Sequence, residues 1–62
     1  MENNEAVKAL IKKHRLFQYE VAEVMHVSEG RLSTLLRRPL TEKAESEIRA
    51  AINHLVNNQN SD

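Results

Sequence analysis

The chain has 62 residues, a formal net charge of zero, no cysteine, one glycine and one proline, and 40% of its residues are hydrophobic. That length gives one small domain, which buries only about 60% of the surface its unfolded chain exposes. The absence of cysteine excludes disulfides and thiolate zinc sites, the shortage of turn residues argues against an all-β fold, and zero net charge at first counts against a nucleic-acid partner.

The charges are nevertheless unevenly distributed along the chain. Residues 1–38 carry seven basic and five acidic side chains, whereas residues 39–62 carry two basic and four acidic ones. The basic side chains of the first part are Lys8, Lys12, Lys13, Arg15, Arg31, Arg37 and Arg38. This asymmetry favours a polyanionic partner only weakly, and taken alone it is better explained by a normally solvated surface.

Two helices are predicted in the first part of the chain. The first runs from about Asn4 to His14, with Asn3 or Asn4 as its N-cap. Its apolar residues recur at helical spacing and are Ala6, Val7, Leu10 and Ile11. The second is shorter, from about Gln18 to Met25, and its apolar stripe is Val21, Ala22 and Met25.

Two further helices follow. The third runs from about Glu29 to Arg37, with Ser28 as N-cap and Leu32, Leu35 and Leu36 facing inward. Pro39 ends it, because the residue before a proline is biased away from helical geometry. Thr41 caps the fourth, which extends to about Val56 along the stripe Ala44, Ile48, Ala51, Ile52 and Leu55. Residues 57–62 have no apolar side chain to bury, so we expect a disordered tail after a domain of residues 1–56.

The segment from Leu16 to Leu36 has a specific mechanical property. Two short helices joined by about three residues must cross steeply, so a small residue, Ala22, is needed where they approach most closely. Val27 in the turn and Leu32 in the next helix then fill the space between them. This is the requirement of a helix-turn-helix, whose second helix enters the DNA major groove.

The pattern Gln18-x3-Ala22-x4-Val27-Ser28-x3-Leu32-Ser33 resembles the helix-turn-helix of the Cro and phage-repressor family, over about a third of the chain. The resemblance implies an all-α fold, a small four-helix cluster of the lambda-repressor type, and a DNA-binding transcriptional regulator. It implies that Gln18 holds a DNA phosphate. It also implies that the recognition helix exposes Ser28, Glu29, Gly30, Arg31, Ser33 and Thr34.

These side chains have chemistry suited to DNA. Arg31 can bind guanine O6 and N7, Glu29 can accept from cytosine N4, and Ser33 or Thr34 can bond bases or pack on a thymine methyl. Gly30 costs the helix roughly 1 kcal/mol relative to alanine and allows close approach of the backbone. Arg37 and Arg38 are expected to contact phosphates. An N-cap role explains Ser28 without DNA, and an interaction with the helix dipole explains Glu29.

Three features depart from the family pattern. Phe17 occupies the position where the family has a capping Thr or Ser. His26 occupies the turn position where the family has glycine with positive φ, a geometry that histidine tolerates better than most residues. The family also has a fifth helix, so the dimerisation mode is left open, with Ile52, Leu55 and Val56 as candidate contacts.

Other classes of function have no support in the sequence. The longest apolar run is about three residues against the roughly 20 of a membrane span, so we expect a cytoplasmic protein. His14, His26 and His54 are scattered, no phosphate-binding glycine motif is present, and the chain is too short for a ligand pocket of about 300 Å³. We therefore expect neither an enzyme nor a cofactor.

Two hypotheses remain. The first is a Cro-like regulator that binds double-stranded operator DNA as a homodimer, on half-sites about 34 Å apart. The second is an antirepressor-type module that binds another regulatory protein, favoured by the zero net charge and the acidic fourth helix. Substitutions that damage function at the exposed residues Phe17 and Tyr19 would support it, because aromatic anchors dominate protein interfaces. A purely structural helical module explains the helices but not the motif spacing.

Overall fold

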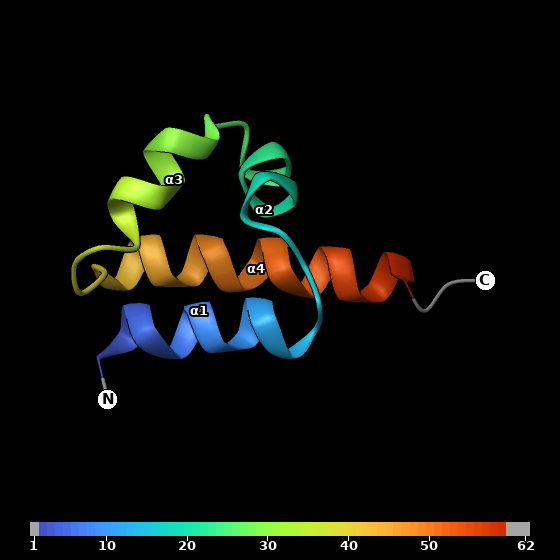
Figure 1. Ribbon diagram of the computed structural model, residues 1–62, viewed down its shortest axis with the longest axis horizontal. Coiled ribbons are helices and arrows are strands. Elements are labelled where there is room, and N and C mark those ends of the chain that lie inside the picture. The colour runs from blue at the N-terminus through green and yellow to red at the C-terminus, as the bar shows by residue number, and fades with distance from the viewer. Residues whose placement is uncertain (1, 60–62) are drawn as a thin grey trace.

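Every predicted helix forms. The computed structural model describes residues 2–59, and within that range it contains four helices and no strand (Figure 1). They are α1 (Asn3–Lys13), α2 (Gln18–Met25), α3 (Glu29–Leu35) and α4 (Glu42–Gln59). The predicted all-α class is confirmed, and the predicted bounds of α2 are reproduced.

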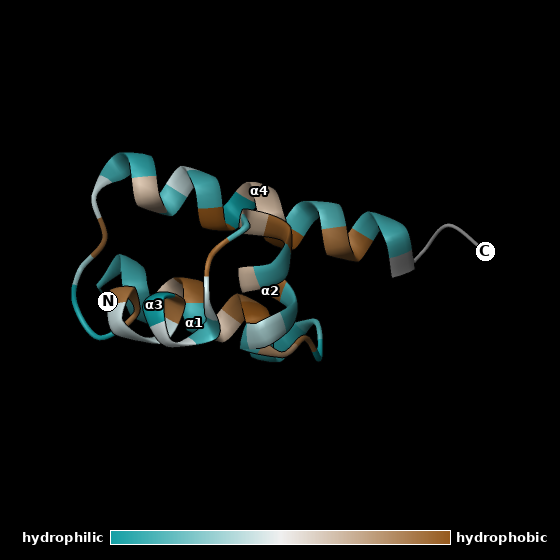
Figure 2. Ribbon diagram, turned by 90° about the horizontal axis from the view of Figure 1, so that it is seen from above, coloured by the Kyte–Doolittle hydropathy of each residue, from teal (hydrophilic) through white to brown (hydrophobic). Residues whose placement is uncertain are grey.

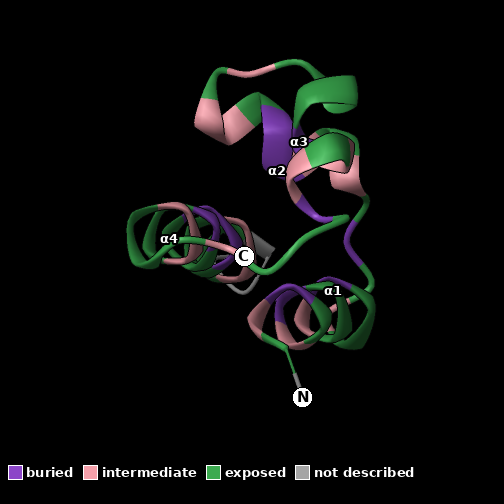
Figure 3. Cartoon of the chain, turned by 90° about the vertical axis from the view of Figure 1, so that its left-hand side faces the viewer, coloured by how far each residue is buried: buried purple, intermediate pink, exposed green. Residues whose placement is uncertain are grey.

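The longest helix, α4, is the element around which the others are arranged. It packs against both α1 and α2, and α2 also packs against α3. α1 and α4 run side by side in the same direction, and α2 and α3 lie above them (Figures 1 and 3). The C-terminal part of α4 extends beyond the other helices (Figure 2). Within residues 2–59, no helix combines the length and the apolarity needed to cross a membrane.

The core is aliphatic and draws on all four helices. Its buried residues are Val7, Ile11, Leu16, Val21, Ala22, Leu32, Leu36, Ile48, Ala51 and Ile52. All of them except Leu16 belong to the predicted apolar stripes. Leu10 and Met25 from those stripes are only half-buried and pack at the edge of the core, and Leu35, predicted to face inward, is also only half-buried.

Leu16 is buried because of the way α1 ends. Arg15 has a left-handed backbone with φ 58°, its N–H donates to the Lys12 carbonyl at 3.0 Å, and the Leu16 N–H donates to the Ile11 carbonyl at 2.9 Å. This pair of hydrogen bonds is a Schellman motif, in which the residue after the left-handed position turns back onto the last turn of the helix. The motif therefore directs Leu16 into the core.

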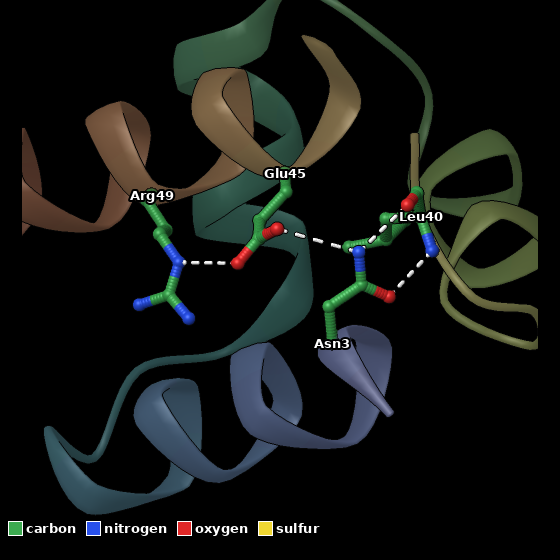
Figure 4. A network of polar contacts seen from close by, with 4 residues as sticks. All are labelled: Asn3, Leu40, Glu45 and Arg49. Atoms are coloured by element: carbon green, nitrogen blue, oxygen red, sulfur yellow. Dashed lines mark hydrogen bonds and ion pairs between the residues drawn. The ribbon is translucent and has the colours of Figure 1, made fainter. Parts of the chain in front are cut away.

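The predicted capping of α1 by Asn3 or Asn4 is wrong. Glu2 is the N-cap and makes no side-chain capping hydrogen bond. Asn3 instead binds both backbone groups of Leu40, with Nδ2 to the carbonyl oxygen at 2.6 Å and Oδ1 to the N–H at 2.7 Å (Figure 4). Asn4 is buried, and its Nδ2 donates to the Leu36 carbonyl at 2.9 Å. An amide carries both a donor and an acceptor, so it satisfies backbone groups that no helix uses.

The ends of α3 and α4 also differ from the predictions. α3 ends at Leu35, two residues before the predicted end at Arg37. Thr41 caps α4 as predicted, because its Oγ1 accepts from the Ala44 N–H at 3.1 Å. The helix then continues to Gln59, so the expected tail is wrong for residues 57–59, and its remainder, residues 60–62, lies outside the described residues.

Candidate nucleic-acid interface

The turn between α2 and α3 is fixed by backbone hydrogen bonds and one left-handed residue. His26 has φ 61° and ψ 38°, which confirms the predicted positive φ. Its N–H donates to the Glu23 carbonyl at 3.1 Å, and the Val27 N–H donates to the Ala22 carbonyl at 3.0 Å. These bonds form a second Schellman motif. The turn is therefore built locally, with a histidine in the position that usually takes glycine.

Ser28 starts α3 as its N-cap. The Arg31 N–H donates to Ser28 Oγ at 3.1 Å, so the structural role proposed for this serine is confirmed. Glu29 lies in the first turn of α3, where a carboxylate interacts favourably with the helix dipole. Both residues thus have a structural role that is independent of any partner.

The exposed face of α3 is unusually smooth. Leu32 and Leu36 point into the core, and helical geometry places Gly30 and Thr34 on the opposite face. Gly30 has no side chain, and Thr34 folds its own side chain back so that Oγ1 donates to the Gly30 carbonyl at 2.9 Å. The helix backbone is therefore directly accessible along this face.

Three guanidinium groups border that face. Arg31, Arg37 and Arg38 are all exposed, and none of them has an ion-pair partner among residues 2–59. The salt bridge within this range joins Arg49 to Glu45 on α4, at 2.9 Å. The guanidinium groups of Arg31, Arg37 and Arg38 are therefore free of ion pairs within the described part of the chain.

Gln18 is the first residue of α2 and is half-buried. Phe17 precedes it as N-cap and has no side-chain acceptor, but the Glu20 carboxylate accepts from the Phe17 N–H at 2.9 Å. This is one half of a capping box, the half in which the third helical residue reaches back. The missing Ser or Thr cap is thus partly compensated.

The two aromatic residues of the chain flank Gln18 and lie outside the core. Phe17 is 60% exposed and Tyr19 is 52% exposed. Their rings stack, with centroids 5.5 Å apart and planes inclined by 16°. The sequence predicts that both are exposed, but their stacking depends on side-chain rotamers that it does not specify.

Seven of the nine residues predicted to bind DNA are exposed, and Gln18 and Ser33 are half-buried. Eight of the nine fall within the segment 28–38 of the sequence, and Gln18 precedes them at the start of α2.

Two other predictions are wrong. Ile52, a candidate dimer contact, is only 2% exposed, because it faces the core; Leu55 and Val56 are half-buried. The chain also does have hollows above 300 Å³. An open groove of about 470 Å³, hereafter the α2–α4 groove, lies between Val24, Met25 and Val27 on one side and Glu47, Ala50 and His54 on the other.

The chemistry of the described residues gives no metal centre, because residues 2–59 contain no group of three or more His, Asp or Glu side chains placed to hold an ion. The features that mark a possible site are therefore the smooth, positively bordered face of α3 and the aromatic pair on α2. Comparison of the chain with protein-family models, with curated proteins and with solved structures finds no match.

Proposed function

We propose that the chain is a sequence-specific DNA-binding transcriptional regulator in which α2 and α3 act as a helix-turn-helix and α3 enters the major groove. The observation that carries this proposal is the exposed face of α3. It combines an accessible backbone at Gly30 and Thr34 with three exposed arginines that have no ion-pair partner among residues 2–59. A helix with such a face suits a groove lined by phosphates.

The glycine supports the proposal most directly. Gly30 lies in the first turn of α3, where glycine costs up to the roughly 1 kcal/mol relative to alanine that it costs in a helix interior. It has no positive φ, and a Cβ at this position would meet nothing within 4 Å. The fold therefore gives no reason for a glycine here, whereas close approach of a partner to the backbone does.

The side chains around Gly30 divide into two roles. Arg31 lies in the N-terminal half of α3, the part that reads base edges in a helix-turn-helix, and a guanidinium binds guanine bidentately. Arg37 and Arg38 follow the end of α3 and suit phosphates. The Thr34 hydroxyl hydrogen is directed to the Gly30 carbonyl, so its methyl group is the part suited to a thymine methyl.

The test begins with selection of binding sites from a random DNA library, followed by titration of the selected duplex with competitor DNA at several salt concentrations. Log affinity should fall with log salt by about 0.9 per phosphate neutralised. Arg31→Ala should lose about 1–3 kcal/mol of discrimination at one base pair, whereas Arg38→Ala should weaken all sequences alike and reduce the salt slope by about one.

Lys8→Ala is the matched control, because Lys8 is an exposed cation on α1, on the other side of the molecule from α3 (Figure 1). It should leave both affinity and discrimination unchanged. Indiscriminate binding at physiological salt, or equal losses from Arg31→Ala and Lys8→Ala, would count against the proposal.

Gly30→Ala separates stability from function. The substitution should stabilise α3 by up to about 1 kcal/mol, since the added methyl group meets open space. In the complex the same methyl group stands between the helix and the DNA, so affinity should fall. A variant that is more stable and binds equally well would remove Gly30 from the interface.

A second candidate function is binding of another regulatory protein, as an antirepressor does, and the exposed Phe17–Tyr19 stack favours it. Aromatic anchors contribute much of the binding energy of protein interfaces. Under this alternative the chain selects no DNA sequence, and replacing Phe17 and Tyr19 by serine abolishes capture of the regulator while Arg31→Ala leaves it intact. Under the DNA-binding proposal, Arg31→Ala is the damaging substitution and the replacement of Phe17 and Tyr19 is tolerated.

A further inference from the structure

The α2–α4 groove is an open surface lined mostly by apolar side chains. Val24, Met25 and Val27 form one side of it, and all three are only half-buried. The other side is α4, where Ala50 is exposed between Glu47 and His54. The groove therefore exposes apolar surface next to one acidic and one basic side chain.

The residues of α4 at this groove have a symmetric order. Glu47 lies three positions before Ala50, and His54 lies three positions after Ala51. Residues at such spacing share one flank of a helix. An antiparallel copy of α4, related by a two-fold axis between positions 50 and 51, therefore brings Glu47 of each chain opposite His54 of the other.

We infer that the occupant of the α2–α4 groove is a second copy of this chain, in a two-fold dimer whose α4 helices cross antiparallel at Ala50. The pairing of a carboxylate with an imidazole donor is complementary to itself under the two-fold operation, which is what an isologous interface requires. The small side chain of Ala50 permits an interaxial distance of about 8 Å, the lower end of helix packing. At that distance Val24 and Met25 of both copies close over the crossing.

A contact with Asn58 leaves His54 able to donate a hydrogen bond to the other copy. Its Nε2 lies 3.2 Å from Asn58 Nδ2. When the Asn58 amide donates to Nε2, the imidazole hydrogen is on Nδ1 and is available to the Glu47 carboxylate of the other copy. The surface differs from the sequence-based expectation of contacts through Ile52, Leu55 and Val56.

This inference rests on the proposed function only for the biological purpose of the dimer, because a two-fold protein reads a two-fold operator. It is therefore tested without DNA, by sedimentation equilibrium of the full chain from low to high micromolar concentration. We expect a reversible dimer. Ala50→Arg places two like charges at the crossing and should raise the dissociation constant by about tenfold or more. Ala9→Arg, at an exposed alanine of α1, should leave it unchanged.

A charge exchange distinguishes this crossing from any other dimer. Glu47→Lys places a lysine opposite His54, and His54→Glu places two carboxylates opposite each other. Each substitution should therefore weaken the dimer. The double variant E47K/H54E restores an attractive pair and should recover wild-type association. Far-UV circular dichroism melts of all variants verify that these exposed substitutions leave the fold intact.

The outcomes separate the two proposals. A wild-type chain that stays monomeric, an Ala50→Arg variant that dimerises normally, or a double variant without recovery overturns the dimer and leaves DNA binding by α3 to its own test. A dimer that responds as expected but selects no DNA sequence supports this inference and overturns the regulator.

Discussion

The two connections on either side of α3 are held in different ways. In the α2–α3 turn, the backbone bonds of His26 and Val27 and the bond from Arg31 to Ser28 all join groups within five positions. In the α3–α4 linker, Leu36 and Leu40 are bound by Asn4 and Asn3, which are 32 and 37 positions away. The turn therefore forms from its own residues, whereas the linker needs the first turn of α1 already in place.

The largest expected effect is the loss of the linker's buried support. Asn4→Ala leaves the Leu36 carbonyl without its donor, which should cost about 1–3 kcal/mol in the free energy of unfolding. Asn4 Oδ1 is buried without a hydrogen-bond partner among the described residues, so its removal offsets part of that loss. Urea unfolding followed by far-UV circular dichroism measures the change.

Asn53→Ala serves as the control for Asn4→Ala, because Asn53 is an exposed asparagine of α4 and its loss should change stability by less than about 0.5 kcal/mol. If both variants unfold at the same urea concentration, the linker does not depend on Asn4.

The next effect concerns Leu40. Asn3→Ala removes two hydrogen bonds from a half-buried backbone, and we expect a loss of about 1 kcal/mol, since water can replace part of them. Asn3→Asp keeps the acceptor for the Leu40 N–H, but it loses the donor and adds a charge beside Glu45. At neutral pH it should therefore be less stable than the wild type in the same urea titration; wild-type stability of Asn3→Asp would show that the donor is dispensable.

A substitution in the α2–α3 turn, by contrast, should raise the free energy of unfolding. His26→Gly relieves a left-handed strain of roughly 1–2 kcal/mol, partly offset by the greater entropy of glycine in the unfolded chain, so we expect a net gain of about 0.5–1 kcal/mol. His26→Ala keeps the strain and should not share the gain. Thermal melts compare the two variants, and equal melting temperatures would mean that His26 carries no strain.

The smallest expected effect is the pH dependence of stability that arises from Glu45, close to the linker. Hydrogen bonds from Arg49 and then from Asn3 lower the pKa of Glu45, so its contribution to stability is present above the unfolded-state pKa and is lost as pH falls through the folded-state value. Glu45→Gln should therefore lose less stability than the wild type between about pH 5 and pH 3. Parallel acid limbs of melting temperature against pH would show that this carboxylate contributes nothing.

The sequence predicts well those features that are decided by residues close together along the chain. The bounds of α2, the caps Ser28 and Thr41, and the positive φ of His26 all depend on residues within one helical turn, and all are confirmed. The exposure of most α3 residues follows in the same way from the stripe that contains Leu32.

The remainder depends on contacts between distant parts of the chain. Asn3 and Asn4 have good capping chemistry, so only the position of Leu40 and Leu36 shows that they support a linker instead. Ile52 and Val56 are indistinguishable as surface candidates until the packing of α4 buries the first. DNA binding itself stays a prediction, because it depends on a partner.

The position of the aromatic residues makes the chain optically unusual. Tyr19 is its only tyrosine and it has no tryptophan, so near-ultraviolet absorption and emission arise almost wholly from a half-exposed ring at the start of α2. Such a signal changes little when the core melts. It should change when DNA or a protein covers that ring, so the intrinsic fluorescence of the unlabelled chain reports contact at this surface rather than unfolding.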